Sequence, residues 1–269
     1  MAETSQLLSG LGLTNKVAVV TGGTDGIGRG IAEGLALAGA NVVVASRRPE
    51  RCAEVESSLK ALGAESLGVP TDVTDEGAVK GLFDAATARF GGVDVLVNCA
   101  GGSFSDRFRR ARLLESTGMD LVESYRLNVV SAFLCSSAAY PLMVARGGGA
   151  IVNISSVGGD SATPAGMFAA YGASKAALNH LTRSLAGEYA PLVRVNAVAP
   201  GLIETPRTAA SRTPERLAAS LAGIALGRIG TPEDVASVVL FLVSASASWM
   251  TGSNIRIDGG GGLLPGEGR

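Results

Sequence analysis

The sequence is poor in the residues on which several kinds of active site depend. It contains a single histidine, His180, which leaves no basis for a multi-histidine metal site or a Ser-His-Asp triad. We interpret His180 as an ordinary packed or surface residue of a helix. The three cysteines, Cys52, Cys99 and Cys135, are widely spaced and offer neither a disulfide framework nor zinc-ligand spacing. We therefore expect no metal and a reducing compartment.

Charge of one sign and long apolar runs are also scarce. The 23 basic and 24 acidic residues give a net charge of −1 and form no long run of one sign, so no footprint for nucleic acid or an anionic membrane is present. A local cluster of arginines at 107–112 is interpreted as a solvated surface turn. The first 13 residues lack the pattern of a secretion signal, and no later run has the roughly 18 apolar residues of a membrane span. We expect a soluble, cytoplasmic protein that binds neither nucleic acid nor membrane.

Apolar β-branched runs alternate with helical patterns along the 269 residues. Strands are expected around Val17–Val20, Val42–Ala45, Ser66–Val69, Val93–Val97, Ala150–Ile154, Val193–Val198 and Asn254–Ile257. Helices are expected near Ile27–Ala38, Pro49–Leu62, Glu76–Phe90, Asp120–Arg146, Tyr171–Tyr189 and Pro232–Ser244. Strands without polar alternation, separated by helices, indicate a parallel sheet covered on both faces. The pattern predicts an α/β protein with a single-domain, doubly wound Rossmann fold and a mostly parallel seven-stranded sheet.

A glycine-rich turn follows the first expected strand. Gly22, Gly26 and Gly28 have the spacing Gly-x-x-x-Gly-x-Gly, and helical periodicity begins within the motif. Glycines let the backbone turn tightly and approach a pyrophosphate, while the N–H groups and positive end of the helix face the anion. The motif predicts a nucleotide site, although a plain strand-to-helix connection would also use glycine.

Tyr171 and Lys175 stand four residues apart at the start of an expected helix, with Ser155 and Ser156 upstream. Residues at this spacing share one helical face, so the Lys175 ammonium is expected to favour the Tyr171 phenolate and lower the pKa of the phenol. A tyrosine placed in this way exchanges a proton near neutral pH. The pair alone is also compatible with a solvated helix face.

Nearly all candidate motifs follow expected strands, and the carboxyl ends of parallel strands share one sheet edge, where ligands bind. These motifs are Thr21–Gly28, Ser46–Arg48, Asp72–Val73, Asn98–Gly101, Ser155–Ser156 and Pro200–Gly201. Together they predict a nucleotide cleft beside Tyr171.

Over about residues 14 to 260 these residues resemble the short-chain dehydrogenase/reductase family. The matching motifs are Thr21-Gly22-x-x-x-Gly26-x-Gly28, Asp72, Asn98-x-Ala100-Gly101, Asn128, Ser156, Tyr171-x-x-x-Lys175, Asn196 and Pro200-Gly201-x-x-x-Thr205. The resemblance implies one dinucleotide-binding catalytic domain over 1–269, with its core at 14–260. It also implies a homotetramer or homodimer. The segment 206–230 suits a substrate lid.

The resemblance also assigns roles. Tyr171 is expected to be the general acid/base, Ser156 to hold the substrate oxygen, Lys175 to tune Tyr171 and bind the nicotinamide ribose, and Asn128 to support a water-linked proton path. Ser156 is preferred to Ser155 because Ser-Val-Gly-Gly at 156–159 resembles the family's catalytic serine with its next three residues. The implied cofactor-binding residues are Gly22, Thr24, Asp25, Gly26, Ile27, Gly28, Ser46, Arg47, Arg48, Asp72, Val73, Asn98, Ala100, Gly101, Tyr171, Lys175, Pro200, Gly201, Ile203 and Thr205.

Cofactor choice depends on the end of the second strand. Ser46 stands where an acidic residue would bind the ribose of NAD, and Arg47 with Arg48 suits a 2′-phosphate. NADP(H) is therefore expected rather than NAD(H). Asp25 argues against it, because many NADP-using relatives have a basic residue in the glycine loop. Arg47 and Arg48 are also compatible with a solvated pair, and Asp72 with a turn cap. Cys99, which lacks a neighbouring base, is expected to be inert.

These observations predict an NADP(H)-dependent oxidoreductase that interconverts a ketone and a secondary alcohol. A 3-oxoacyl thioester or another apolar ketone suits Met167 and Phe168, which precede Tyr171. Two alternatives remain open. Val44–Arg47 and Gly101–Phe104 are similar to enoyl- and dienoyl-thioester reductases, which typically lack this tyrosine, and a non-catalytic NADP(H)-sensing regulator would share the fold.

Overall fold

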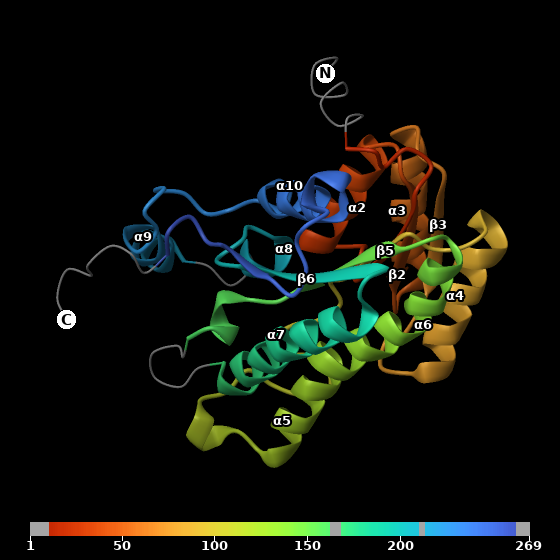
Figure 1. The fold of residues 1–269 in the computed structure, drawn as a ribbon. Helices are drawn as coiled ribbons and strands as arrows, with labels where there is room; N and C mark the ends of the chain where they lie inside the picture. The colour runs from red at the N-terminus through yellow and green to blue at the C-terminus, as the bar shows by residue number, and fades with distance from the viewer. Residues whose placement is uncertain (1–10, 162–167, 210–212, 262–269) are drawn as a thin grey trace.

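The computed structural model describes residues 11–161, 168–209 and 213–261 (Figure 1). Its centre is a seven-stranded sheet of order β3-β2-β1-β4-β5-β6-β7, in which every neighbouring pair is parallel. The strands are β1 Val17–Thr21, β2 Asn41–Ser46, β3 Ser66–Pro70, β4 Val95–Asn98, β5 Gly149–Ile154, β6 Val193–Pro200 and β7 Asn254–Ile257. The predicted fold class is confirmed, and the sheet is parallel throughout.

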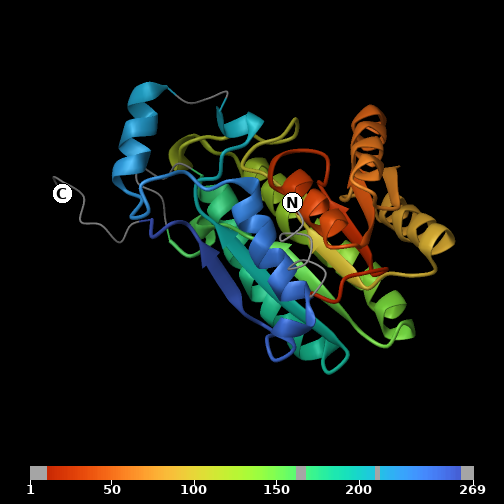
Figure 2. The same cartoon turned by 90° about the horizontal axis from the view of Figure 1, so that it is seen from above.

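Helices cover both faces of this sheet (Figures 1 and 2). The longer ones are α2 Gly26–Leu37, α3 Pro49–Ala61, α4 Glu76–Phe90, α5 Gly118–Tyr125, α6 Ser131–Ala145, α7 Ala169–Tyr189, α9 Pro214–Ala222 and α10 Pro232–Val243. Shorter helical turns are η1 Leu113–Glu115, η3 Val157–Gly159, α8 Pro206–Ala209 and η5 Ala245–Ala247, and η2 Arg126–Val130 is a π-helical turn.

Two buried apolar clusters hold the layers together. On one face, Val20 and Val44 pack with residues of α2, α3 and α10. On the other face, Val19 and Val43 pack with residues of α4, α6 and α7. Because successive strand residues point to opposite faces and both faces are covered, these strands read as continuous apolar runs.

A buried carboxylate joins the strands at the amino-terminal edge of the sheet. Asp94 is 4% exposed, accepts a hydrogen bond from the Val17 amide at 2.8 Å and pairs with Arg146 at 2.9 Å and Lys16 at 3.2 Å. Burial alone would raise the pKa of this carboxyl, but the hydrogen bonds and charges of these partners outweigh it and lower the pKa. Asp94 therefore connects β1, β4 and the end of α6.

The helix expected at Asp120–Arg146 contains an irregular turn. A capping box of Thr117 and Asp120 starts α5, and the π-turn η2 joins α5 to α6 in one helical stretch. Residues 118–145 of this stretch are long and apolar enough to cross a membrane by length and composition. The stretch nevertheless packs against α4, α7 and the central strands, as the core helix of a domain does. That packing accounts for its apolar composition.

The segment after β6 forms α8 and α9 and projects from the body of the domain at the carboxyl edge of the sheet (Figures 1 and 2). A parallel bridge between Ile203 and Gly230 closes its base. Within the segment expected as a lid, residues 210–212 lie outside the described residues, as does Met167 of the expected apolar wall.

Candidate active site

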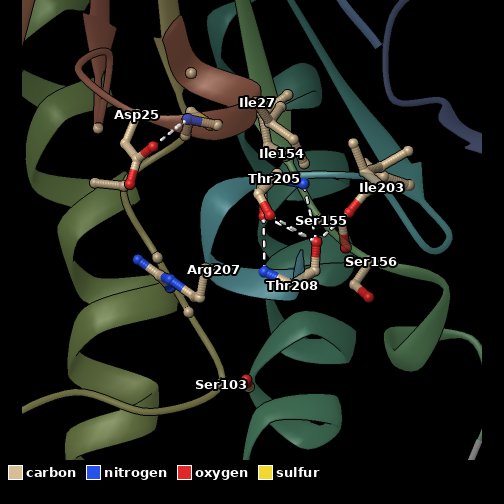
Figure 3. Close-up of a pocket in the computed structure, with 18 of the residues that line it drawn as sticks. Asp25, Ile27, Ser103, Ile154, Ser155, Ser156, Ile203, Thr205, Arg207 and Thr208 are labelled. Atoms are coloured by element: carbon tan, nitrogen blue, oxygen red, sulfur yellow. Dashed lines mark hydrogen bonds between the residues drawn. The ribbon is translucent and has the colours of Figure 1, made fainter. Parts of the chain in front are cut away.

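A groove runs along the carboxyl ends of the strands, where the sequence motifs were expected to meet. It consists of two cavities that share Gly22, Asp25, Ala100, Gly101 and Arg207 in their walls. One cavity holds Tyr171 and Lys175, and the other holds Arg47 and Asp72 (Figure 3 shows the first). All the predicted site residues line one or both cavities, apart from Asn98 and Asn128.

The glycine loop leaves no room for side chains. A Cβ added to Gly28 would lie 2.2 Å from the Gly22 carbonyl oxygen, and one added to Gly22, whose φ is 65°, would lie 2.9 Å from the Ala100 backbone. Asp25 caps α2 by accepting the Gly26 amide hydrogen bond at 2.8 Å. The start of α2 therefore faces a groove whose walls permit close approach of a pyrophosphate, so these residues fit a dinucleotide.

Tyr171 and Lys175 lie on one face of α7, as their spacing predicts. The Lys175 ammonium is 5.6 Å from the centre of the Tyr171 ring and donates a hydrogen bond to the Ile154 carbonyl oxygen at 2.7 Å. The Ser156 hydroxyl lies close enough to the Tyr171 phenol to favour its ionised form. The end of β5 and the start of α7 thus bring a hydroxyl, a phenol and an ammonium to one cavity.

The electrostatics of Tyr171 differ from expectation. Burial raises the pKa of the phenol above its ordinary value, while the nearby Ser156 hydroxyl and the charge of Arg207 oppose that rise. The prediction that Lys175 lowers the pKa of Tyr171 is wrong for this structure, because burial dominates and the pKa is raised. Burial also lowers the pKa of Lys175 itself, to about 8. Arg207, which the sequence analysis did not select, is the cation that favours the phenolate.

Ser155 and Ser156 have different environments. Ser155 is 3% exposed and its hydroxyl bonds to the Asn179 side chain and the Lys175 carbonyl oxygen. Ser156 accepts a hydrogen bond from the Gly158 amide at 3.2 Å and reaches Tyr171. The geometry therefore supports Ser156 in contact with substrate and Ser155 as support for α7.

Asn128 lies in the π-turn η2, and such turns are frequent at functional sites. Its side chain exchanges hydrogen bonds with the Gly102 backbone, at 3.0 Å to the amide and 3.1 Å to the carbonyl oxygen. A Cβ on Gly101 would lie 2.6 Å from the Asn128 Oδ1 and 3.3 Å from the Lys175 Nζ. Asn128 therefore fixes the loop that follows β4 against Lys175.

Asn98 was expected to bind cofactor, but its side chain points into the fold. It is 4% exposed and donates to Asn153 at 2.9 Å and to Ser136 at 3.1 Å. We assign Asn98 to the support of the β4 end instead. Its neighbour Cys99 lines the cavity, and burial raises the pKa of this thiol to about 11, in agreement with an unreactive cysteine.

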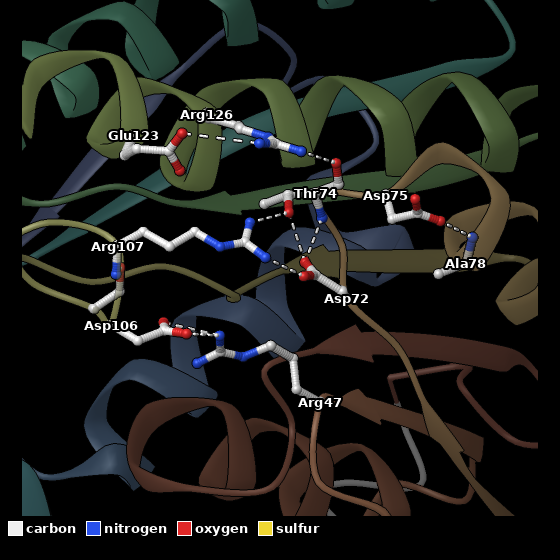
Figure 4. A network of polar contacts seen from close by, with 10 residues as sticks. Arg47, Asp72, Thr74, Asp75, Ala78, Asp106, Arg107, Glu123 and Arg126 are labelled. Carbon is white, nitrogen blue, oxygen red and sulfur yellow. Dashed lines mark hydrogen bonds and ion pairs between the residues drawn. The ribbon is translucent and has the colours of Figure 1, made fainter. Parts of the chain in front are cut away.

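The second cavity is crossed by ion pairs (Figure 4). Arg47 binds the Asp106 carboxylate at 3.0 Å, and Arg107 binds Asp72 at 3.0 Å. Asp72 also accepts hydrogen bonds from the Thr74 amide and hydroxyl, so it caps a turn while it lines the cavity. Burial would raise the pKa of Asp72, but these bonds lower it. Asp106 and Arg107 were not predicted, since no local pattern links them to β2 or β3.

Metal ligation is not indicated in the described residues, where no group of three or more histidine, cysteine, aspartate or glutamate side chains could hold an ion. The glycine loop, Tyr171 and Ser156 line one and the same cavity.

Comparisons with known proteins agree with this geometry. A family model described as "Enoyl-(Acyl carrier protein) reductase" matches residues 22–261. The chain is 40% identical over 250 residues to the 3-oxoacyl-(acyl-carrier-protein) reductase FabG of Aquifex aeolicus, covering 92% of this chain and 98% of the relative. It is 36% identical over 252 residues to the 7alpha-hydroxysteroid dehydrogenase of Escherichia coli, covering 93% and 96%.

A solved 7 alpha-hydroxysteroid dehydrogenase, complexed with NADH and 7-oxo glycochenodeoxycholic acid, superposes with a TM-score of 0.86 at 35% identity. The match covers 93% of this chain and 95% of that one. Sequence, fold and groove agree, and the chain belongs to the short-chain dehydrogenase/reductase family, as an oxidoreductase that acts on CH–OH/C=O groups with a nicotinamide cofactor.

Proposed function

We propose that the protein is an NADP(H)-dependent reductase that interconverts a ketone and a secondary alcohol, with Tyr171 as general acid/base. The observation that carries the proposal is the meeting of Tyr171, Ser156 and Lys175 in the wall of one cavity with the glycine loop. A scaffold that only holds nucleotide would have no need of this set.

The roles of the residues follow from their positions. The bound nicotinamide supplies the hydride in reduction and accepts it in oxidation. Ser156 holds the substrate carbonyl oxygen by a hydrogen bond, and the Tyr171 hydroxyl gives that oxygen its proton as the C=O bond becomes CH–OH. The resulting phenolate is stabilised by Ser156 and by the positive charge of Arg207. Asn128 and Lys175 hold the adjoining loop and the end of β5, and return of the proton along a water-linked path beside Asn128 completes the cycle.

Replacement of the phenol tests the proposal directly. Tyr171→Phe removes the proton donor, and kcat/KM for a ketone is expected to fall about 10²- to 10⁴-fold while NADPH binding, followed by fluorescence titration, stays within twofold. Tyr125→Phe, an exposed tyrosine of α5, is the matched control. Undiminished turnover by Tyr171→Phe would reject Tyr171 as the acid.

The NADP(H) preference rests on Arg47, Arg48 and Arg107, which line the second cavity, and on Ser46 in place of an acidic residue. A 2′-phosphate there meets cationic side chains, whereas an acidic residue at the end of β2 would repel it. Asp25, which argued against NADP, caps α2 and is engaged by the Gly26 amide.

The substrate class we favour is a 3-oxoacyl thioester or another apolar ketone. The relatives named for 3-oxoacyl and hydroxysteroid substrates support carbonyl/alcohol exchange. An enoyl-thioester reductase is the second candidate, favoured by the description of the matching family model. A screen of NADPH oxidation against ketones, 3-oxoacyl thioesters and enoyl thioesters separates the two, and binding without turnover of any of them would favour a regulator.

The remaining parts of the proposal concern assembly and location. We place the catalytic domain at 1–269, with 206–230 as the lid, in a cytoplasmic homotetramer or homodimer. Apolar side chains of the 118–145 helical stretch reach solvent, namely Leu121, Val122, Tyr125 and Phe133. Exposed apolar surface of this kind marks contact sites between proteins. Light scattering of the purified enzyme measures the assembly.

A further inference from the structure

Two arginines lie against aromatic rings near the groove: Arg207 lines both of its cavities, and Arg110 bonds to Ser103 of the cavity wall. The Arg110 guanidinium lies 4.6 Å from the centre of the Phe168 ring and 5.2 Å from that of Phe104. The Arg207 guanidinium lies 5.5 Å from the same Phe104 ring. Phe104 therefore joins two cations that would otherwise repel each other.

Several arginines of this region are neutralised by carboxylates, but these two are not. In the part of the chain that the structure describes, neither Arg110 nor Arg207 forms an ion pair, whereas Arg47, Arg107 and Arg109 each pair with a carboxylate. Partial burial and the nearby charge of Arg207 lower the pKa of Arg110, which shows that the two positive charges act on each other. Two guanidinium groups that lie against one ring and pair with no carboxylate of the described residues attract an anion.

Their position relates them to the reacting atoms. Arg110 donates a hydrogen bond to the Ser103 hydroxyl at 3.2 Å, and Ser103 lines the cavity of Tyr171. Phe168 stands three residues before Tyr171 and has a φ of 67°, a left-handed conformation that is rare for a bulky residue and that sets the ring beside Arg110. Arg207 lies near enough to Tyr171 for its charge to act on the phenol.

We infer that Arg110 and Arg207, backed by Phe104 and Phe168, form an oxyanion-binding site that selects substrates carrying a carboxylate or a phosphate together with the ketone. The inference rests on the proposed ketone reduction and narrows its substrate class. The rings supply apolar contact for the carbon chain, and the guanidinium groups supply two-pronged hydrogen bonds for the anion. The arginine cluster interpreted from sequence as a solvated turn thus contains, besides Arg107 at the second cavity, another member with a binding role.

Paired substrates test the inference. A medium-chain 3-oxo acid is compared with its methyl ester, and a 3-oxoacyl coenzyme A thioester with the 3-oxoacyl N-acetylcysteamine thioester, which lacks phosphate. The wild-type enzyme is expected to prefer the anionic member of at least one pair by about tenfold or more in kcat/KM. The pair that shows the preference identifies the anion as carboxylate or phosphate.

The variants Arg110→Gln and Arg207→Gln are expected to reduce that preference about tenfold through KM, with NADPH affinity within twofold of wild type. Arg207→Gln is also expected to lower kcat equally for both members of a pair, because the Arg207 charge favours the Tyr171 phenolate. Arg112→Gln removes the same charge from the same segment without touching a ring, and should keep the preference. An unchanged preference in Arg110→Gln and Arg207→Gln overturns the inference. Weakened NADPH binding with unchanged preference also overturns it, because the arginines would then serve the cofactor pyrophosphate.

A binding measurement separates this inference from the proposed function. Decanoate is expected to raise the Tm of the NADPH complex of the wild type more than decanol does, and this difference should vanish in Arg110→Gln. Anion-dependent stabilisation without turnover of any ketone would support the site and reject the reductase. Efficient turnover of neutral ketones with no anion effect would support the reductase and reject the site.

Discussion

The two ends of the groove are built differently. At the Tyr171 end, Lys175 and Asn128 are 4% and 1% exposed and are held by backbone carbonyl and amide groups. At the Arg47 end, the Arg47 and Asp106 side chains are 57% and 63% exposed and are held by each other. A buried group bonded to backbone keeps its position, whereas an exposed ion pair exchanges partners at small cost. Under the proposed function, the catalytic groups are therefore fixed before substrate binds, whereas the residues that select the cofactor must exchange one partner for another.

The largest effect is expected at the buried end. Lys175→Met should lower kcat/KM about 10²-fold or more, because the ammonium that binds the Ile154 carbonyl oxygen in the wall of the Tyr171 cavity is lost. The same substitution also removes a buried ammonium, whose desolvation lowers the stability of the folded protein. Exposed Lys80, which pairs with Asp84 on α4, provides the control Lys80→Met, expected to leave activity unchanged.

The stability of Lys175→Met should depend on pH in a defined direction. The folded-state pKa of Lys175 is lowered to about 8 from the model-peptide value of 10.5, so the folded protein bears the full cost of the buried charge below pH 8. The cost fades as pH rises from about 8 to 10.5. The Tm of the variant relative to wild type should therefore be higher at pH 7 than at pH 10, and calorimetry showing the opposite trend would contradict a buried charged lysine.

Gly101→Ala should have the next largest effect. The new Cβ would lie 2.6 Å from the Asn128 Oδ1, which cannot yield without loss of its bonds to Gly102. Overpacking of this kind costs about 1–3 kcal/mol, so we expect a lower Tm and roughly tenfold lower kcat. The control is Gly81→Ala, in open space on α4, which should raise stability by about 0.5–1 kcal/mol. If Gly101→Ala and Gly81→Ala had the same Tm and kcat, the backbone near Tyr171 would be able to shift and accommodate the added methyl group.

Arg47→Ala tests the exposed end. Loss of a charge-assisted hydrogen bond to phosphate is worth about 1.5–3 kcal/mol, so the Kd of NADPH should rise about tenfold or more while that of NADH changes less than threefold. Fluorescence titration measures both. Arg51→Ala, which removes an exposed arginine of α3 paired with Glu54, is the control. Equal losses for the two cofactors would reject the NADP(H) assignment.

Asp106→Asn should have the smallest effect and the opposite sign. The Asp106 carboxylate holds Arg47 and would compete with a 2′-phosphate for it. Because both side chains are exposed, the gain is small, and NADPH should bind at most about fivefold more tightly. Asp84→Asn, which breaks an exposed pair on α4, controls for the change of net charge. If Asp106→Asn binds NADPH no more tightly than Asp84→Asn does, the Arg47–Asp106 ion pair does not weaken NADPH binding.

The fold and the backbone of the site could be predicted because they depend on local patterns. Apolar runs marked the strands, and Gly22, Gly26 and Gly28 marked the turn by spacing alone. The direction in which individual site side chains point could not be predicted from their neighbours in the sequence. Asn98 ends the strand that Ala100 and Gly101 follow, but its side chain points into the fold toward Asn153. The pKa of Tyr171 likewise depended on burial and on distant Arg207 rather than on its neighbour in sequence.

The arginine cluster shows the same limit. From sequence its four members are equivalent, yet Arg107 pairs with Asp72, Arg109 with Asp120, and Arg110 stacks on Phe104 and Phe168. These partners come from several separate parts of the chain, so only the tertiary fold distinguishes the arginines. Their roles could not be assigned from spacing.

The position of Asp94 indicates which parts of the enzyme can accept substitutions without loss of the fold. Its contacts to Lys16, Val17 and Arg146 lie at the sheet edge opposite the catalytic groove. Loops above the groove can therefore acquire new residues, and with them new selectivity, while this anchor below remains untouched. A library confined to 103–112 and 206–230 should yield many folded variants, whereas one directed at Asp94 should yield few.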